Sequence, residues 1–283
     1  MSRVAHQLEQ IKAARKNREV VIVTSPSVSH AGLVSERFMS EYRGTKIAYE
    51  TLENTNLRGV IKNLFEQDRL PDIDIDNSDY VLSFGADFLD TWISPVRYSR
   101  GYGEFRQGGH HRGKLVHVDS RFSMTGANAD ELIYVEPGRE GLLALSISQV
   151  IIDEGLGDSK AAASLTGEGQ IDINQWAPDK VAEIVGVSAE TIKHVAREFA
   201  SKDHPVAFGG GLAGAHTNGK ANLTAIFSLN YLVGSVNKPG GLIFNPAPPT
   251  PELQEVENNL NIGSMSEWRD LVRDMEDGKV QAL

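Results

Sequence analysis

Two glycine-containing turns directly follow apolar runs of the sequence. Gly85 and Asp87 follow the run at residues 80–84, and Gly209 and Gly211 belong to a second turn of this kind. Glycine at the end of a strand lets the backbone approach a ligand and offers amide donors to an anion. The second turn matches neither the dinucleotide fingerprint nor the P-loop. A nucleotide site and a plain tight turn therefore stay open as interpretations.

An acidic and a basic residue lie close together after the apolar run at residues 114–118. Asp119 can accept hydrogen bonds from a ribose or from the N–H groups of guanine, and Arg121 can donate two hydrogen bonds to a phosphate. The alternative is a local Asp–Arg ion pair that closes the loop. The segment in isolation favours that alternative.

The histidines give a weaker signal. His216 lies in the second glycine-rich turn, where a ligand would bind. His110, His111 and His117 lie near one another, but their spacing does not put two of them on one helix face, and no carboxylate accompanies them at a fixed distance. We interpret them as part of a solvated basic loop and predict no metal site.

The elements that must position these turns follow from the apolar pattern. Buried strands are predicted at residues 20–24, 80–85, 114–118, 132–135 and 205–208. Helical stretches are predicted at residues 1–17, 30–42, 88–105, 140–154, 158–166, 178–200, 221–236 and 264–275. Within 178–200, Ser188 can cap a helix that runs to Ala200. The alternation predicts an α/β fold with two Rossmann-like parallel-sheet domains, residues 1–155 and 156–283. We expect the second domain to be incomplete, because strand-like residues 279–283 end the chain.

Composition excludes several classes of function. The 283 residues include 28 Lys+Arg and 38 Asp+Glu, a net charge of −10, which argues against nucleic acid as a partner. The absence of cysteine excludes disulfides, cysteine nucleophiles and a cysteine-ligated iron–sulfur cluster in this chain. No apolar run approaches the roughly 20 residues that a membrane-spanning helix needs.

A series of short segments, taken in order, resembles the molybdopterin oxidoreductases of the dimethyl sulfoxide reductase family. No single segment is specific, but their order across residues 20–283 carries the resemblance. The segments are DYVLSFGAD (79–87), KLVHVDSR (114–121), TGANAD (125–130), VEPGREG (135–141), GGG with HTNG (209–219) and LVGSVNKPGG (232–241).

The resemblance implies a redox role and a set of cofactor-binding residues. The family binds a bis-molybdopterin guanine dinucleotide cofactor and supports two-electron chemistry in anaerobic or respiratory electron transfer. The resemblance assigns to the nucleotide end of one pterin Gly85, Asp87, Asp119, Arg121, Gly138 and Glu140. Near the other pterin it places Gly209, Gly211, His216 and Asn218.

The sequence also departs from the family. Asp87 stands where the family usually has Asn, and residues 50–58, where the metal ligand belongs, contain neither Cys nor Ser. We therefore expect a fragment that covers the two middle domains of a longer parent and that binds no metal by itself. The resemblance implies iron–sulfur and membrane-anchor subunits as partners of the parent, in the periplasm or at a membrane.

Two alternative functions stay open. Residues 88–92 and 125–130 resemble the molybdopterin-like subunits of alternative complex III and menaquinone reductase, which lack the metal cofactor. On that resemblance, the chain would be a cofactor-free structural subunit of a quinone-linked respiratory complex. The second alternative is a standalone Rossmann-like nucleotide-binding domain. The sequence assigns no catalytic residue.

Overall fold

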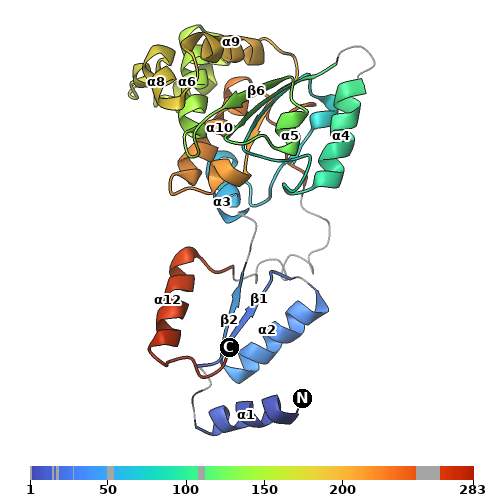
Figure 1. Ribbon diagram of the computed structural model, residues 1–283, viewed down its shortest axis with the longest axis vertical. Helices are drawn as coiled ribbons and strands as arrows, with labels where there is room; N and C mark the ends of the chain where they lie inside the picture. Colours follow the sequence, from blue (N-terminus) through green and yellow to red (C-terminus); the bar gives the residue numbers. More distant parts are fainter. Residues whose placement is uncertain are drawn as a thin grey trace. The chain divides into compact units, whose positions relative to one another are not determined.

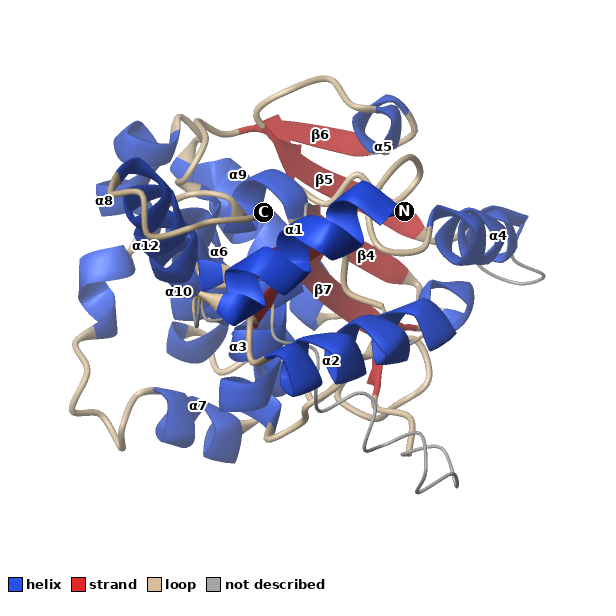
Figure 2. Cartoon of the chain, turned by 90° about the horizontal axis from the view of Figure 1, so that it is seen from below, coloured by secondary structure: helices blue, strands red, loops and turns tan. Residues whose placement is uncertain are grey.

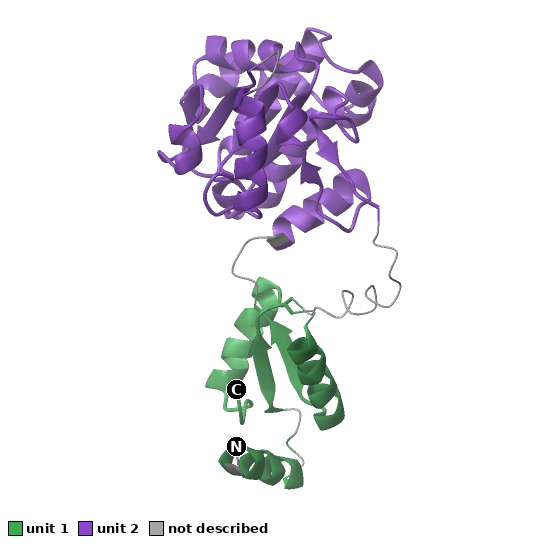
Figure 3. Cartoon of the chain, turned by 90° about the vertical axis from the view of Figure 1, so that its right-hand side faces the viewer, with its two compact units in different colours: residues 1–52, 247–283 green, residues 53–246 purple. Residues whose placement is uncertain are grey.

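The chain forms a mixed α/β structure with parallel sheets, as the apolar pattern predicts (Figure 1). It divides into two compact units: a smaller unit of residues 1–52 and 247–283, and a larger unit of residues 53–246 (Figure 3). This division does not follow the boundary expected at residue 155. The computed structural model describes residues 2–14, 16, 19–27, 29–49, 54–107, 112–246 and 262–283.

The larger unit is built on a four-stranded sheet in the order β6-β5-β4-β7, with every neighbouring pair parallel. The strands are β4 (Tyr80–Phe84), β5 (Lys114–Asp119), β6 (Glu131–Tyr134) and β7 (Pro205–Gly209). β4 and β7 are buried along their whole length, which explains their continuous apolar sequences. Because β7 pairs with β4, residues on both sides of the expected boundary share one sheet.

Helices cover both faces of this sheet (Figures 1 and 2). One face carries α6 (Glu140–Asp153), α9 (Ala189–Ala200) and α10 (Gly219–Leu232), and the other carries α4 (Pro95–Gln107). The remaining elements of the unit are α3 (Asn54–Phe65), β3 (Asp72–Ile73), η2 (Ile75–Asn77), α5 (Met124–Ala127), α7 (Ser159–Leu165), η3 (Ile173–Trp176), α8 (Pro178–Val185), η4 (Gly211–Gly214) and β8 (Leu242–Ile243).

Two predicted helices differ from the structure. The helix expected over residues 88–105 begins only at Pro95, a residue suited to the first turn of a helix. The helical stretch expected over residues 178–200 is two helices. Gly186, with φ of 72°, closes α8, and the Ser188 side chain accepts from the Thr191 N–H and caps α9, as expected. Local cap chemistry interrupts an otherwise helical apolar pattern.

The core of the larger unit is held by aromatic stacking and by one buried amide. Phe208 of β7 stacks on Trp92 at 5.3 Å between ring centroids and meets Phe88 edge-on at 5.4 Å. At the open edge of β7, the Asn230 side chain accepts from the Ala207 N–H at 2.9 Å and donates to the Ala207 carbonyl at 2.6 Å. This amide takes the place of a further strand at that edge.

The smaller unit is a β–α–β arrangement completed by the far end of the chain. β1 (Val21–Thr24) and β2 (Thr45–Ala48) are parallel, with α2 (His30–Tyr42) between them in sequence. Single parallel bridges join Val20 to Ala282 and Ala48 to Ile262. The unit also contains α1 (Ser2–Ala13) and α12 (Met265–Glu276). None of the helices described in either unit is long and apolar enough to cross a membrane.

Candidate functional site

The predicted binding residues of the larger unit gather where the strands of its sheet end, here called the carboxyl edge. The strands are parallel, so the turns after β4, β5, β6 and β7 all open at this edge. A Cβ on Gly85 would lie 2.8 Å from the Ala213 nitrogen, and one on Gly211 would lie 2.6 Å from the Gly85 carbonyl oxygen. The turns after β4 and β7 therefore pack backbone against backbone, and glycine is required by contact as well as by φ angles of 61° and 53°.

The turn after β6 meets the loop after β7. Gly138, at φ 88°, leaves room for this contact, since a Cβ there would lie 3.5 Å from both the His216 ring and the Asn218 side chain. Asn218 Nδ2 donates to the Gly138 carbonyl at 2.7 Å. Residues that the resemblance assigned to two different pterins are therefore neighbours in one unit.

Two long helices begin side by side at this edge. A Cβ on Gly141, in the first turn of α6, would lie 2.4 Å from the Cα of Asn222, in the first turn of α10. Asn222 Nδ2 donates to Glu140 Oε2 at 3.1 Å and joins the two helix starts. The positive ends of two helix dipoles thus meet in one region, an arrangement that favours negative charge. The Glu140 carboxylate lies in this region and accepts from its own N–H and from the N–H of Gly138.

The loop after β7 has a buried polar atom without a partner. Among the residues that the structure describes, His216 Nε2 is buried and makes no hydrogen bond. A buried polar atom without a partner costs free energy unless a ligand or water satisfies it. A cavity of about 390 Å³ lies beside this loop and is lined in part by Gly138, Arg139, Asn218 and Asn222. These features suit a ligand that brings hydrogen-bonding oxygens to the edge.

Glu140 is buried at the start of α6. Burial raises the pKa of Glu140 above its ordinary value, against the opposing effects of its own N–H, the N–H of Gly138 and the charge of His216. The charge of Asp119 adds to the rise. Groups from the turns after β5 and β7 thus both act on this carboxyl of the β6 turn.

Asp119 ends β5 and is buried next to His117. Burial alone would raise the pKa of Asp119, but its hydrogen bond with His117 and the backbone N–H groups of Ser120 and Arg121 lower the pKa below its ordinary value. Its two oxygens differ in role. Oδ1 accepts from Ser120 N at 2.7 Å, and Oδ2 lies 3.2 Å from His117 Nε2. Asp119 is therefore held as a fixed carboxylate at the edge.

Asp87 is already engaged within the chain. Its Oδ1 accepts from both the backbone N–H of Thr125 at 3.0 Å and the Thr125 hydroxyl at 2.8 Å, and its Oδ2 accepts from Arg121 at 2.8 Å. Asp87 is buried, whereas the Arg121 side chain is 54% exposed. The loop-closing ion pair thus involves Asp87 of the β4 turn rather than the neighbouring Asp119.

Some predicted residues have packing roles, and some relevant residues were missed. Gly209 ends β7 and is buried against the Ile226 side chain of α10, so it faces the core. Asn222 and Thr125, which hold Glu140 and Asp87, were not among the predicted site residues. A lone buried Asn near the start of an apolar helix is the signal that would have found Asn222.

The structure gives no metal site among the residues that it describes: there, no three His, Cys, Asp or Glu side chains are grouped closely enough to hold an ion. His117, one of the clustered histidines, is buried in β5 rather than solvated, because it pairs with Asp119. His110 and His111 lie outside the described residues, as do residues 50–53 of the segment expected to contain the metal ligand.

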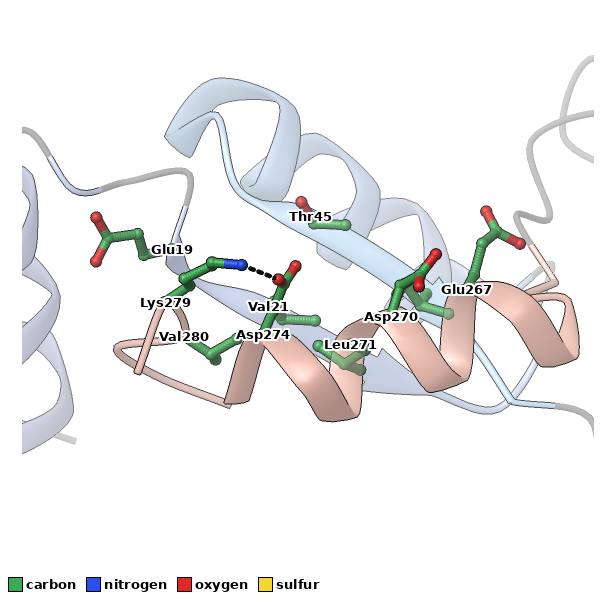
Figure 4. A pocket seen from close by; sticks show the side chains of 10 residues that line it. Glu19, Val21, Thr45, Glu267, Asp270, Leu271, Asp274, Lys279 and Val280 are labelled. Carbon is green, nitrogen blue, oxygen red and sulfur yellow. Dashed lines mark hydrogen bonds and ion pairs between the residues drawn. The ribbon is translucent and has the colours of Figure 1, made fainter. Parts of the chain in front are cut away.

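A different hollow lies in the smaller unit, between its two strands and α12 (Figure 4). It has a volume of about 370 Å³ and an apolar floor that includes Val21, Ile47 and Leu271. Its rim carries one lysine, Lys279, which pairs with Asp274 at 2.9 Å, and the carboxylates of Glu19, Glu267, Asp270 and Asp274. This excess of negative charge does not suit an anionic ligand.

Comparison with known proteins gives consistent matches. The sequence model described as molybdopterin oxidoreductase matches residues 1–247. The chain is 30% identical over 174 residues to the menaquinone reductase molybdopterin-binding-like subunit of Nitratidesulfovibrio vulgaris, covering 60% of this chain and 24% of that protein. It is 27% identical over 212 residues to the arsenate respiratory reductase molybdopterin-containing subunit of Chrysiogenes arsenatis, covering 66% and 24%.

A solved structure has the same fold. Acetylene hydratase from Pelobacter acetylenicus is similar with a TM-score of 0.62 at 20% identity, over 82% of this chain and 32% of that one. The chain spans about a quarter of the length of the curated relatives named above.

Proposed function

This chain belongs to the molybdopterin oxidoreductase family, and from that premise we propose that the carboxyl edge of its larger unit binds the guanine dinucleotide part of a molybdopterin cofactor. The observation that carries the proposal is the meeting of two helix starts, α6 and α10, beside a buried His216 nitrogen without a partner. A pyrophosphate would supply an acceptor oxygen for this nitrogen and negative charge beside the two helix starts.

The other residues of the carboxyl edge have separate proposed roles in binding. Asp119, held ionised by His117 and two backbone N–H groups, is the acceptor suited to the N–H groups of guanine. The Gly138 turn lets the backbone come close to the pyrophosphate, and Asn218 fixes that turn from the opposite loop. Adenine presents a different set of donors and acceptors, so this edge is expected to prefer guanine.

The proposed cofactor would supply two-electron or oxygen-atom transfer at its molybdenum. The residues of this edge bind and orient only its nucleotide end. We further propose that a longer protein containing this chain acts in respiratory electron transfer with iron–sulfur and membrane-anchor subunits. Support comes from the names of the relatives, which describe one as a subunit of a menaquinone reductase and another as a subunit of a respiratory arsenate reductase.

Calorimetric titration of the 283-residue chain with guanosine 5′-diphosphate tests the proposed site. We expect guanosine diphosphate to bind more tightly than adenosine diphosphate, and His216→Ala to weaken its binding about tenfold, the loss of one hydrogen bond to a charged group. His194→Ala is the matched control, because His194 is exposed on α9. Equal affinity for the two nucleotides, or equal effects of the two variants, would contradict the proposal.

A second function, a structural subunit without the cofactor, is favoured by one specific observation. Asp87 neutralises Arg121, the cation that the sequence offered to a phosphate. On this proposal the edge keeps the fold of a nucleotide site, but Arg121 pairs with Asp87 and is not available to a phosphate.

The variant Asp87→Asn separates the two functions. An asparagine side chain can still accept from Thr125, but its amide group repels Arg121 and releases it. If the edge has lost cofactor binding, guanosine diphosphate binds weakly to the natural chain and about tenfold more tightly to Asp87→Asn. If the edge binds the cofactor as it stands, the natural chain already binds and the variant changes the affinity little.

A further inference from the structure

We propose that a second cavity in the larger unit binds a small neutral molecule that carries a carbonyl group. The cavity has a volume of about 340 Å³ and lies among α3, α6, α7, η3 and α10. Its walls are mostly apolar and include Leu64, Leu145, Ile152, Trp176 and Ala225. It adjoins the carboxyl-edge cavity through Leu145 and Ala221 but shares none of the predicted nucleotide-binding residues.

Most polar groups of this wall are already satisfied. The hydroxyls of Ser148, Thr224 and Ser228 each donate to the carbonyl four residues earlier in their own helix, at 2.7–2.9 Å. Thr166 does the same toward Ala162 at 2.9 Å. These side chains therefore behave as part of the helix surface and do not need a ligand.

Gln149 is the exception. It lines the cavity from α6, and only 5% of its surface is exposed. Its amide makes no hydrogen bond with any residue that the structure describes, and its polar atoms are not fully buried, so the amide is open to the cavity. An apolar cavity with one convergent, unsatisfied polar group is the usual form of a small-molecule site.

The chemistry of the wall limits the ligand. No described residue that lines the cavity is charged, so an ionic ligand would lose its hydration without compensation. The Gln149 amide has two donor hydrogens, which favours a ligand with an acceptor such as a ketone or amide carbonyl. Trp176 offers an aromatic surface for a ring. A neutral cyclic ketone combines these properties.

The test compares two ring compounds that differ by one carbonyl. α-Tetralone and its hydrocarbon counterpart tetralin are titrated into the full chain while methyl NMR shifts of Leu145 and Leu232 are followed. We expect the ketone to bind about tenfold more tightly than the hydrocarbon, and Gln149→Leu to remove that difference, because one buried hydrogen bond is lost. Gln175→Leu is the matched control, since Gln175 is exposed and does not line the cavity.

A second variant keeps the proposal falsifiable if Gln149→Leu does not fold. Ser228→Phe fills the cavity from α10 and is expected to abolish the shifts caused by both compounds while leaving guanosine diphosphate binding unchanged. Equal affinities for ketone and hydrocarbon, or shifts that persist in Ser228→Phe, would overturn the proposal. So would a change in sedimentation of Ser228→Phe, because the cavity would then be a contact between copies of the chain.

Discussion

The larger and smaller units use the same β–α–β pattern with different degrees of coverage. In the larger unit, β4 has a parallel neighbour on each side, and helices cover both faces of the sheet. In the smaller unit, β1 and β2 pair with each other, and only single bridges extend them. Its buried apolar residues form two small clusters, around Val20 and around Val21, instead of one core. A two-stranded sheet is only marginally stable alone. The number of strands and covering helices, rather than the shared β–α–β sequence pattern, therefore decides how rigid each unit is.

The two units also differ in the hollows that they form. The carboxyl edge of the larger unit offers helix starts and a buried histidine nitrogen without a partner. The hollow of the smaller unit is rimmed mainly by carboxylates. The anion site that we propose therefore belongs to the larger unit. The smaller unit is expected to open more easily.

The largest expected difference is between two matched core truncations. Leu82→Ala in β4, where Leu82 is fully buried, is expected to destabilise the larger unit by about 3–5 kcal/mol. Leu271→Ala in α12 is expected to cost only about 1–2 kcal/mol, because Leu271 is 8% exposed and already borders a hollow. Urea unfolding combined with hydrogen exchange of each unit measures both. Equal losses in the free energy of unfolding would contradict the expected difference between the two units.

The next effect concerns the amide that completes the edge of β7. Asn230→Leu removes both hydrogen bonds to Ala207 and leaves a buried N–H and carbonyl without partners. We expect a loss of roughly 2–4 kcal/mol in the larger unit. Asn174→Ala, at an exposed position of the same unit, is the control and is expected to stay within about 0.5 kcal/mol. A small effect of Asn230→Leu would mean that water replaces the amide.

Asp119 should give the larger unit a pH dependence in the acid range. Its folded pKa is lowered, so its ionised form stabilises the fold above the unfolded pKa, and that stability is lost as the pH falls through the folded pKa. Asp119→Asn is expected to cost about 1–3 kcal/mol at pH 7, with the difference from the natural chain narrowing below about pH 4. Asp270→Asn on the rim of the smaller unit is the control. A constant difference down to pH 3.5 would refute this assignment.

The smallest effect is expected at Glu140 and has the opposite sign. Its folded pKa is raised, so the cost of burying the charge is absent below the unfolded pKa and grows as the pH rises toward the folded pKa. Glu140→Gln keeps an acceptor for Asn222 and should stabilise the larger unit at pH 7 by up to about 1 kcal/mol. Unfolding at pH 4 and pH 7 measures the change. Destabilisation at pH 7 would show that the charge at the start of α6 outweighs its burial.

Much of the local structure was predictable because it depends on neighbouring residues. Continuous apolar runs marked β4, β5, β6 and β7 to within one residue of their ends. Ser188 and Gly186 carry the local signals that separate α8 from α9. The carboxyl-edge location of the glycine turns followed from the parallel sheet alone.

The pairings between distant residues were not predictable in this way. No local pattern joins Val20 to Ala282 or Ala48 to Ile262, and the two-part smaller unit depends on these contacts. The partner of Arg121 was also decided in three dimensions, because Asp87 reaches it from another turn while Asp119 is held by His117.

The sequence by itself determined the α/β class, the family and the places where strands end, because each depends on the order of apolar, glycine and cap residues along the chain. The tertiary structure alone decided which turns meet, which carboxyl has a lowered pKa and which amide lines a cavity. Those outcomes depend on burial and on distances between atoms far apart in the chain. Gln149 is an ordinary helix residue in the sequence, and only the cavity that it lines makes it a candidate for binding.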